Sequence, residues 1–139
     1  MITPLRIAHR GASGRGLKPE NTLSAFDEAI EIGVDIIEID VRITGDGKLI
    51  VLHDPSLDRT TDRSGLVRDM LYENVCEANA GEGEKVPLLK DVLNSNHFGD
   101  LGITMFTFIH PRKGLDPRFV YAFFNKDNSL DKKLISLDY

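Results

Sequence analysis

Two short stretches of this chain are apolar, rich in β-branched residues, and end in acids, bases or cations. The first covers residues 7–11, and the second covers residues 37–41 and is followed by residues 52–54. Short β-branched runs are typical of buried strands. We therefore predict a sheet whose strands deliver ionisable side chains, among them His9 and Asp40, to one edge.

Length and composition favour one globular domain over residues 1–139, since 41% hydrophobic residues is enough for one modest core. The formal net charge of −5 argues against nucleic-acid binding driven by overall charge. The single cysteine, Cys76, cannot form an internal disulfide, which fits a reducing compartment. No apolar run approaches the ~20 residues needed to cross a bilayer. We expect a cytoplasmic protein without a membrane span.

The first part of the chain predicts one strand followed by one helix. Residues 5–9 form the expected strand, and a Gly-rich loop over residues 11–18 leads to the helix. Asn21 is the expected N-cap and Gly33 the expected stop. Apolar residues recur between them at helical spacing. They are Leu23, Phe26, Ala29 and Ile30.

Residues 34–44 alternate between an apolar face and a face that carries Glu38, Asp40 and Arg42. Alone, this pattern is also that of a half-exposed strand with a solvated charged face. Residues 45–47 are too few for a helical crossover, however, so residues 48–53 should return as a hairpin. Residues of the two strands whose numbers sum to 92 or 93 would then be opposite each other in the hairpin. This register puts Asp40 beside Leu52 or His53, and Glu38 beside Asp54. Two clustered carboxylates favour a bound metal ion, because without a cation one pKa would rise strongly.

The remaining elements are predicted more coarsely. Residues 55–85 indicate a long functional loop with a short helix near residues 69–76, and residues 86–93 resume a helical pattern. Residues 102–110 predict a strand. Asp116 and Pro117 predict the start of a helix that carries Phe119, Val120, Phe123 and Phe124. Residues 134–137 predict a strand fragment.

The ionisable residues at the strand ends suit phosphodiester hydrolysis. Glu38 and Asp40 offer hard oxygen ligands for a divalent cation, while His9 and His53 can transfer protons. Arg10 can donate two hydrogen bonds to a phosphate. Such a reaction needs a cation, a base for the nucleophile and an acid for the leaving alcohol.

The sequence resembles the glycerophosphodiester phosphodiesterase family over residues 5–93. The matching stretches occur in the family's order and spacing, and residues 94–139 form a divergent carboxy-terminal segment. The stretches are residues 9–11 (HRG), 19–22 (PENT) with 25–26 (AF), 38–41 (EIDV), 44–47 (TGDG), 53–54 (HD), 57–61 (LDRTT) and 86–89 (VPLL).

The resemblance implies an α/β fold, a partial TIM-type β/α barrel that hydrolyses glycerophosphodiesters to glycerol 3-phosphate and an alcohol. In this interpretation Glu38 and Asp40 bind Mg²⁺ or Ca²⁺, His9 and His53 are the acid/base pair with their roles unassigned, and Arg10 contacts the phosphate. Glu20 and His110 are further candidates.

Residues next to these motifs have structural interpretations. We expect Glu20 and Asn21 to cap the first helix. Asp54, Arg59 and Thr61 are expected to hold the loop in place.

Two features depart from the family. Its third metal ligand, a Glu in a Glu-x-Lys pattern on the fourth strand, is absent from residues 94–139. Phe108 stands in its place and His110 stands in place of the Lys. A complete barrel takes about 250 residues, and at most four or five strands fit here. An open half-barrel exposes two sheet edges, which predicts self-association through those edges.

Two functional classes follow. One is a metal-dependent phosphodiesterase, either active itself or equivalent to the amino-terminal half of such an enzyme. The other is a catalytically inactive remnant that binds a phosphorylated ligand or a protein through Arg10, His9 and His53. A phospholipase D related by fold is a third hypothesis, which the stretches at residues 9–11 and 19–22 disfavour.

Overall fold

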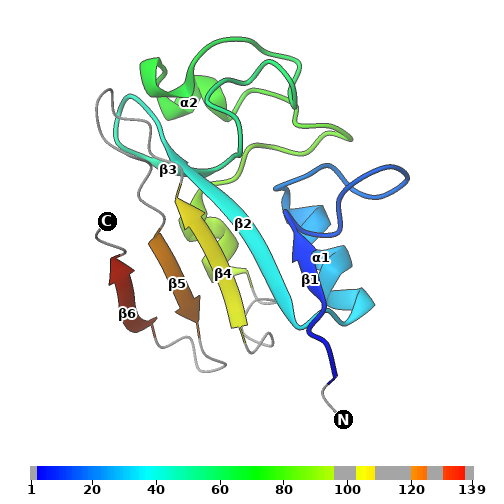
Figure 1. Cartoon of the computed structure of the whole chain (residues 1–139). Helices are drawn as coiled ribbons and strands as arrows, with labels where there is room; N and C mark the ends of the chain where they lie inside the picture. The colour runs from blue at the N-terminus through cyan, green and yellow to red at the C-terminus, as the bar shows by residue number, and fades with distance from the viewer. Residues whose placement is uncertain (1–2, 96–102, 109–119, 125–129, 137–139) are drawn as a thin grey trace.

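The computed structural model contains a twisted sheet with helices packed against it (Figure 1). It describes residues 3–95 and the backbone of residues 103–108, 120–124 and 130–136. The described elements, in chain order, are β1 (Ile7–His9), α1 (Leu23–Ile32), β2 (Ile36–Ile43), β3 (Leu49–Val51), the 3₁₀ helix η1 (Val67–Asp69), α2 (Tyr72–Val75), α3 (Leu89–Asn94), β4 (Ile103–Phe108), β5 (Val120–Phe124) and β6 (Leu130–Ser136).

Strand β2 pairs with three other strands of the sheet. The strand order is β1-β2-β4-β5-β6, and β3 also pairs with β2. β2 is parallel to both β1 and β4, as expected for the start of a β/α barrel, whereas β5 and β6 are antiparallel to their neighbours. Parallel strands need a crossover connection, which α1 supplies between β1 and β2 and the long segment ending in α3 supplies between β2 and β4.

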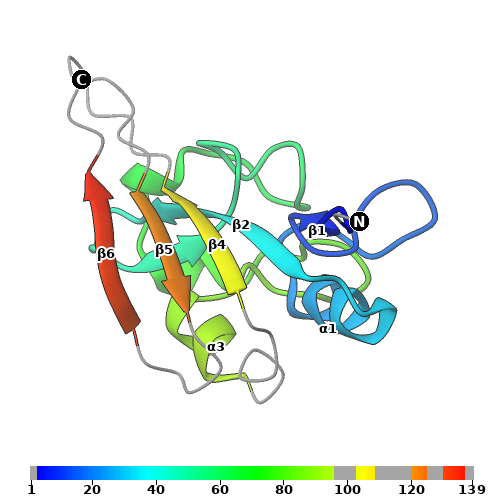
Figure 2. The ribbon, with the colours of Figure 1, turned by 60° about the horizontal axis from the view of Figure 1, so that its bottom comes forward.

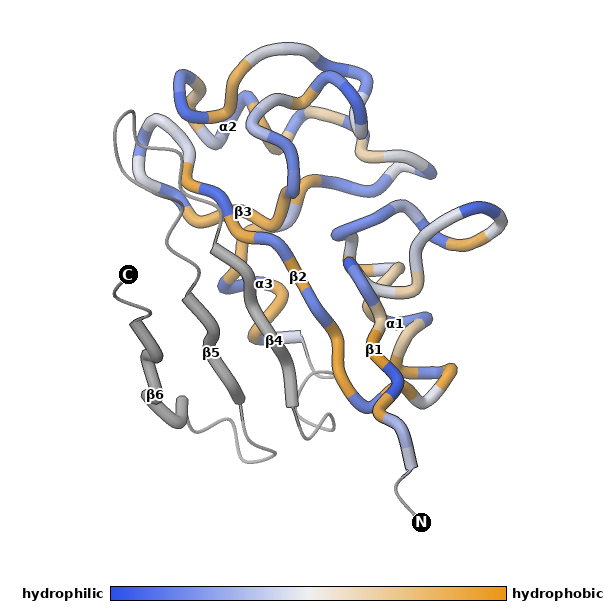
Figure 3. Tube along the Cα trace, in the orientation of Figure 1, coloured by the Kyte–Doolittle hydropathy of each residue, from blue (hydrophilic) through white to orange (hydrophobic). Residues whose placement is uncertain are grey.

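The main hydrophobic core lies between β2 and the helices α1 and α3. These two helices lie on the same side of the sheet (Figure 2). Apolar and polar residues alternate along β2 (Figure 3), so one of its faces can pack against the helices. The core residues contributed by these elements are Phe26, Ala29, Ile37, Ile39, Val41, Leu89 and Val92.

A second apolar cluster stabilises the long loop after β3. Its buried residues come from β3, the loop itself, η1 and α2. The loop is therefore packed around its own core, although its backbone is largely irregular. The short helices η1 and α2 match the expected helix near residues 69–76. The cluster consists of Ile50, Leu52, Leu57, Val67, Val75, Ala78, Ala80 and Val86.

The predicted hairpin is confirmed, with one correction. Val41 is opposite Val51, a pair whose numbers sum to 92, and the Leu52 amide donates to the Asp40 carbonyl at 3.0 Å. Glu38 is not beside Asp54 in the ladder, because β1 and β4 occupy its two sides. The charged face of β2 is also not solvated.

The charged residues of β2 are largely withdrawn from water. Glu38, Asp40 and Arg42 are 9%, 3% and 7% exposed. The interpretation of β2 as a half-exposed strand is therefore wrong. Buried charges require partners, so this face of the strand marks the candidate site.

The start of α1 differs from the prediction by one residue. Thr22 is the N-cap, and its hydroxyl accepts a hydrogen bond from the Ala25 amide. Asn21 instead adopts a left-handed conformation (φ 57°) and directs its amide towards Asp40. The expected stop at Gly33 is confirmed, and its φ of 81° explains why glycine is suitable there.

The predicted helix after Asp116 is wrong where the structure describes it. Val120–Phe124 is the strand β5, which pairs with β4 and β6. Its Val, Tyr and Phe residues have high β-propensity, and a short apolar run of this kind fits a strand as well as a helix. Residues 116–119 lie outside the described part of the chain. The expected strands near residues 102–110 and 134–137 correspond to β4 and β6.

Substitutions at Gly11 and Gly16 test whether the loop after β1 must pack closely against α1. Gly11 and Gly16 both have φ near +80°, but a Cβ at Gly11 would lie 2.8 Å from the Ala25 backbone, whereas at Gly16 it would meet nothing within 4 Å. We expect Gly11→Ala to lower the free energy of unfolding by roughly 2 kcal/mol more than Gly16→Ala. Urea unfolding of both variants measures the difference, and equal effects would show that the close approach does not matter.

Candidate active site

The parallel register of β1 and β2 brings the first histidine to the first acid. The Cα atoms of His9 and Glu38 are paired, and His9 Nε2 lies 3.8 Å from Glu38 Oε2. The side chain of His9 is 70% exposed, while that of Glu38 is 12% exposed. The imidazole is thus open to a ligand from solvent, next to a carboxylate that is held in the sheet.

Arg10 connects the end of β1 to three acidic residues. Its amide donates to the Glu38 carbonyl at 2.8 Å, and its left-handed backbone (φ 62°) turns the chain just after the strand. Arg10 Nη1 donates to Glu20 Oε1 at 3.0 Å. Arg10 Nε lies 3.1 Å from Asp40 Oδ2, but this N–H is not directed at a hydrogen-bond acceptor among the described residues. Arg10 Nε is therefore shielded from solvent, and the guanidinium is held between Glu20 and Asp40.

Asp40 is held by an amide as well as by this cation. Asn21 Nδ2 donates to Asp40 Oδ2 at 3.0 Å, and the Asp40 amide donates to Asn21 Oδ1 at 3.4 Å. The Asp40 side chain is only 4% exposed. A buried carboxylate with these partners is fixed in position.

His53 is fixed by a basic and an acidic residue. Arg42 Nε donates to the His53 carbonyl at 2.6 Å, and His53 Nδ1 lies 2.8 Å from Asp54 Oδ1. Burial lowers the pKa of Arg42, although the charges of Asp54 and Asp40 oppose this shift. An ionised Asp54 can only accept hydrogen bonds, so Nδ1 carries the proton and Nε2 is left for the reaction.

Arg59 lies between the two acids that contact Arg10 and His53. Hydrogen bonds from its guanidinium are the main cause of the lowered pKa of both Asp54 and Glu20, while partial burial opposes both shifts. The same contacts raise the pKa of Arg59, chiefly those with Asp54. Both carboxylates are therefore ionised at neutral pH.

The acid pair of β2 fits a divalent cation in part. Glu38 and Asp40 are hard oxygen donors two residues apart on one strand face, and Mg²⁺ is commonly held by one or two carboxylates together with water and substrate phosphate. Among the described residues, no group of three or more His, Cys, Asp and Glu side chains could hold a metal ion. The protein would thus supply Glu38 and Asp40, and the other ligands would come from elsewhere.

The fourth strand adds no acidic ligand within its described residues. β4 has the sequence ITMFTF, and its register puts Phe108 opposite Val41 and Thr107 opposite Asp40. The other candidate on this segment, His110, lies outside the described residues.

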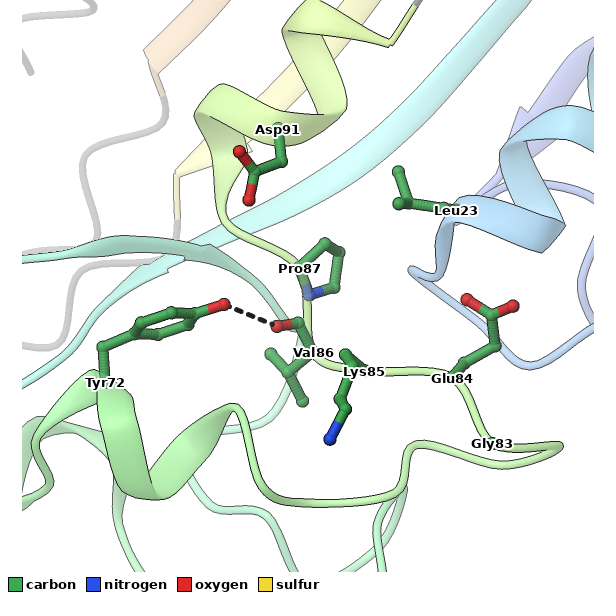
Figure 4. A pocket seen from close by; sticks show the side chains of 8 residues that line it. All are labelled: Leu23, Tyr72, Gly83, Glu84, Lys85, Val86, Pro87 and Asp91. Carbon is green, nitrogen blue, oxygen red and sulfur yellow. Dashed lines mark hydrogen bonds between the residues drawn. The ribbon is translucent and has the colours of Figure 1, made fainter.

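A cavity of about 330 Å³ lies apart from this site (Figure 4). It is bordered by Leu23 at the start of α1, Tyr72 of α2, residues 83–87 and Asp91 of α3, and none of the candidate site residues lines it. The Tyr72 hydroxyl donates to the Val86 carbonyl at 3.5 Å, and burial raises the pKa of Tyr72.

Comparison with known proteins assigns the fold. Residues 9–113 match the model of the glycerophosphoryl diester phosphodiesterase family. The chain belongs to this family. Solved glycerophosphodiester phosphodiesterases with the TIM-type barrel are similar over most of this chain, so its parallel strands β1, β2 and β4 are part of such a barrel.

The relatives compared here are considerably longer than this chain. A glycerophosphodiester phosphodiesterase of Caldanaerobacter subterraneus is 45% identical over 63% of this chain and 38% of its own length. A phosphodiesterase of Oleispira antarctica, solved with the product sn-glycerol-3-phosphate, has a TM-score of 0.71 and 34% identity over 81% of this chain and 47% of that chain. The Thermotoga maritima enzyme has a TM-score of 0.66 and 33% identity over 79% and 46%. The chain spans less than half the length of these relatives.

Sequence reasoning missed several residues of the site. Asp54 and Arg59 were expected to hold only the loop, and Asn21 was expected to cap α1, yet all three contact candidate site residues. Thr61 does have the expected loop role, because its hydroxyl donates to the Leu57 carbonyl at 2.8 Å. The sequence pattern around Arg59 did not indicate its role, because its partners Asp54 and Glu20 are 5 and 39 residues away in the chain.

In the described part of the chain, no helix has the length and apolarity to span a bilayer.

Acid unfolding tests the charge network around Asp54. The lowered pKa of Asp54 stabilises the fold above its usual pKa near 3.8, and this contribution is lost as the pH falls below that value. We expect Asp54→Asn to reduce the stability difference between pH 7 and pH 3 by roughly 1 kcal/mol. Urea unfolding at both pH values measures it, with Asp69→Asn, an exposed acid outside the network, as the control. An unchanged pH dependence in Asp54→Asn would contradict this assignment.

Proposed function

We propose that this chain carries the active site of a metal-dependent phosphodiesterase that hydrolyses glycerophosphodiesters to glycerol 3-phosphate and an alcohol. The β1–β2 register is the observation that supports this most, because it places His9 and Arg10 beside Glu38 and Asp40. Membership of the family supports the same reaction. The relatives named for this activity are longer than the chain, so its own activity is part of the proposal.

Each group at the site has a role in this reaction. Arg10, whose guanidinium is held between Glu20 and Asp40, binds and orients the phosphate. Glu38 and Asp40 would hold Mg²⁺ or Ca²⁺, which when bound neutralises negative charge developing on the phosphoryl group. His9 and His53 provide the acid and the base, and Asp54 keeps the proton of His53 on Nδ1 so that Nε2 faces the reaction. Glu20 holds Arg10 in place.

A second function has its own supporting observation. The described residues of β4 contain no acid, so the metal would have two carboxylate ligands from the described chain. A site with Arg10 and two imidazoles but weak metal affinity would bind a phosphorylated ligand or a protein partner without turnover. In this alternative function, Arg10 still binds a phosphate group, but the metal-dependent hydrolysis does not take place.

The location and assembly of the chain complete the proposal. The unpaired Cys76 fits a reducing, cytoplasmic environment. β1 ends the strand order of the sheet, and its first residue, Ile7, and the preceding Leu5 are 52% and 64% exposed. We infer that a second copy of the chain covers this apolar edge.

Hydrolysis of glycerophosphocholine tests the enzymatic proposal. We expect release of glycerol 3-phosphate that requires Mg²⁺ or Ca²⁺, measured by a coupled assay. Glu38→Ala and Asp40→Ala should abolish both this activity and any rise in melting temperature on adding the metal ion. Asp69→Asn is the control. A folded chain without metal-dependent turnover would leave only the binding function, and a melting shift unchanged in both Ala variants would contradict the ligand roles.

Solution mass tests the edge contact. We expect the wild-type chain to sediment as a dimer and Ile7→Lys to shift the population towards monomer, because a charge on the edge disfavours strand pairing. Sedimentation velocity over a range of concentrations measures both. A wild-type chain that is monomeric throughout would exclude self-association through this edge.

A further inference from the structure

Arg59 joins two carboxylates through one planar guanidinium. Arg59 Nε and Nη2 donate to the two oxygens of Asp54 at 2.8 and 2.9 Å. Arg59 Nη1 and Nη2 donate to the two oxygens of Glu20 at 3.1 and 2.7 Å. Each carboxylate therefore accepts a bidentate pair of hydrogen bonds from the same guanidinium, a geometry that lysine cannot reproduce.

Each of these acids also contacts a residue of the proposed reaction. Glu20 Oε1 accepts from Arg10, and Asp54 Oδ1 lies 2.8 Å from His53 Nδ1. The contacts thus run without a gap from the phosphate-binding arginine through Glu20, Arg59 and Asp54 to the second histidine. Arg10 follows β1 and His53 follows β3, so this chain of charges joins two separate parts of the site.

We propose that Arg59 is a positioning residue that sets the orientation of Arg10 and His53 together. The proposal rests on the hydrolytic function proposed above and adds a residue to it. Arg59 holds Glu20 and Asp54 at one spacing, so the guanidinium of Arg10 and the imidazole of His53 keep a fixed relation across the bound phosphate. Without Arg59, Glu20 and Asp54 each lose two hydrogen bonds, which loosens the orientation of the Arg10 and His53 side chains that they contact.

Stability alone is a poor explanation for this arrangement. The Arg59 side chain is 49% exposed, so solvent reduces what its ion pairs contribute to folding. The loop that carries Arg59 has other supports, among them the Thr61 hydroxyl on the Leu57 carbonyl and the Asp58 carboxylate on the Gly65 amide. A variant at residue 59 should therefore fold, and its effect should appear at the site.

The test compares Arg59→Gln, Arg59→Lys and the control Arg63→Gln in the full chain. Arg63 is on the same loop and similarly exposed, but its ion pair is with Glu77, away from the site. Two properties are measured: the ¹⁵N resonances of the His53 imidazole at a pH where it is neutral, and the affinity for sn-glycerol 3-phosphate by calorimetry. Thermal melting confirms that each variant is folded.

We expect Arg59→Gln to move the His53 Nδ1 and Nε2 resonances towards each other, because Asp54 no longer selects one tautomer. We expect it to weaken glycerol 3-phosphate binding by roughly ten-fold, the scale of one lost charge-assisted hydrogen bond. Arg59→Lys should restore neither property in full, and Arg63→Gln should match the wild type. Where hydrolysis is measurable, Arg59→Gln should lower kcat and raise KM together.

Wild-type resonances and wild-type affinity in folded Arg59→Gln would overturn the proposal, as would full rescue by lysine. If Arg59→Gln does not fold, Arg59→Lys decides in the same way. The His53 spectrum does not depend on turnover, so it separates this proposal from the proposed function. If Arg59→Gln shifts the His53 spectrum but the wild-type chain hydrolyses nothing, the positioning role is supported and the enzymatic function is contradicted. If the wild-type chain hydrolyses the substrate and Arg59→Gln leaves turnover unchanged, the enzymatic function is supported and the positioning role is contradicted.

Discussion

The pairing of β2 with β1 is the interaction on which the site depends. It sets the Cα atoms of His9 and Glu38 opposite each other, and the next residue, Arg10, turns back over β2. The apolar face of β2 fixes this register, because a slip of one residue would put Ile37 and Ile39 on the charged face and the acids in the core. The core and the chemistry are thus two consequences of the same strand alternation.

The acids on β2 are costly to bury, and their neighbours offset that cost. An unpaired buried carboxylate is strongly unfavourable, but Asp40 has the Arg10 guanidinium and the Asn21 amide beside it. Arg10 therefore supplies a positive charge beside these acids, where the sequence pattern alone favours a metal ion. A cation held by Glu38 and Asp40 would share this carboxylate with Arg10, which would bring the ion next to the residue proposed to bind the phosphate.

The sequence was sufficient for the parts of the fold that are governed by local periodicity. Alternation and a short glycine turn predicted the β2–β3 hairpin, and Gly33 predicted the end of α1. It was insufficient where several conformations fit the same residues. Asn21 has the chemistry of an N-cap, but its contact with Asp40 depends on tertiary structure. The apolar run in β5 is compatible with either a helix or a strand, and pairing with β4 selects the strand.

The same distinction applies to the site. The candidate residues were recognisable because each lies within or just after an apolar run, but the residues that orient them were not. Arg59 lies in a loop without periodicity, and its contact with Glu20 spans 39 residues. Only the structure shows that the loop carrying Arg59 packs next to the loop between β1 and α1, which carries Glu20.

Paramagnetic broadening by Mn²⁺ tests the central claim most directly, because Mn²⁺ prefers the same oxygen ligands as Mg²⁺ and reports its position by NMR. If Glu38 and Asp40 form a cation site beside Arg10 and His53, low Mn²⁺ concentrations should selectively broaden the amide signals of these four residues, and Mg²⁺ in excess should restore them. Broadening centred elsewhere, such as on the acids Glu84 and Asp91 of the cavity, or uniform broadening without a centre, would contradict the assembly of this site.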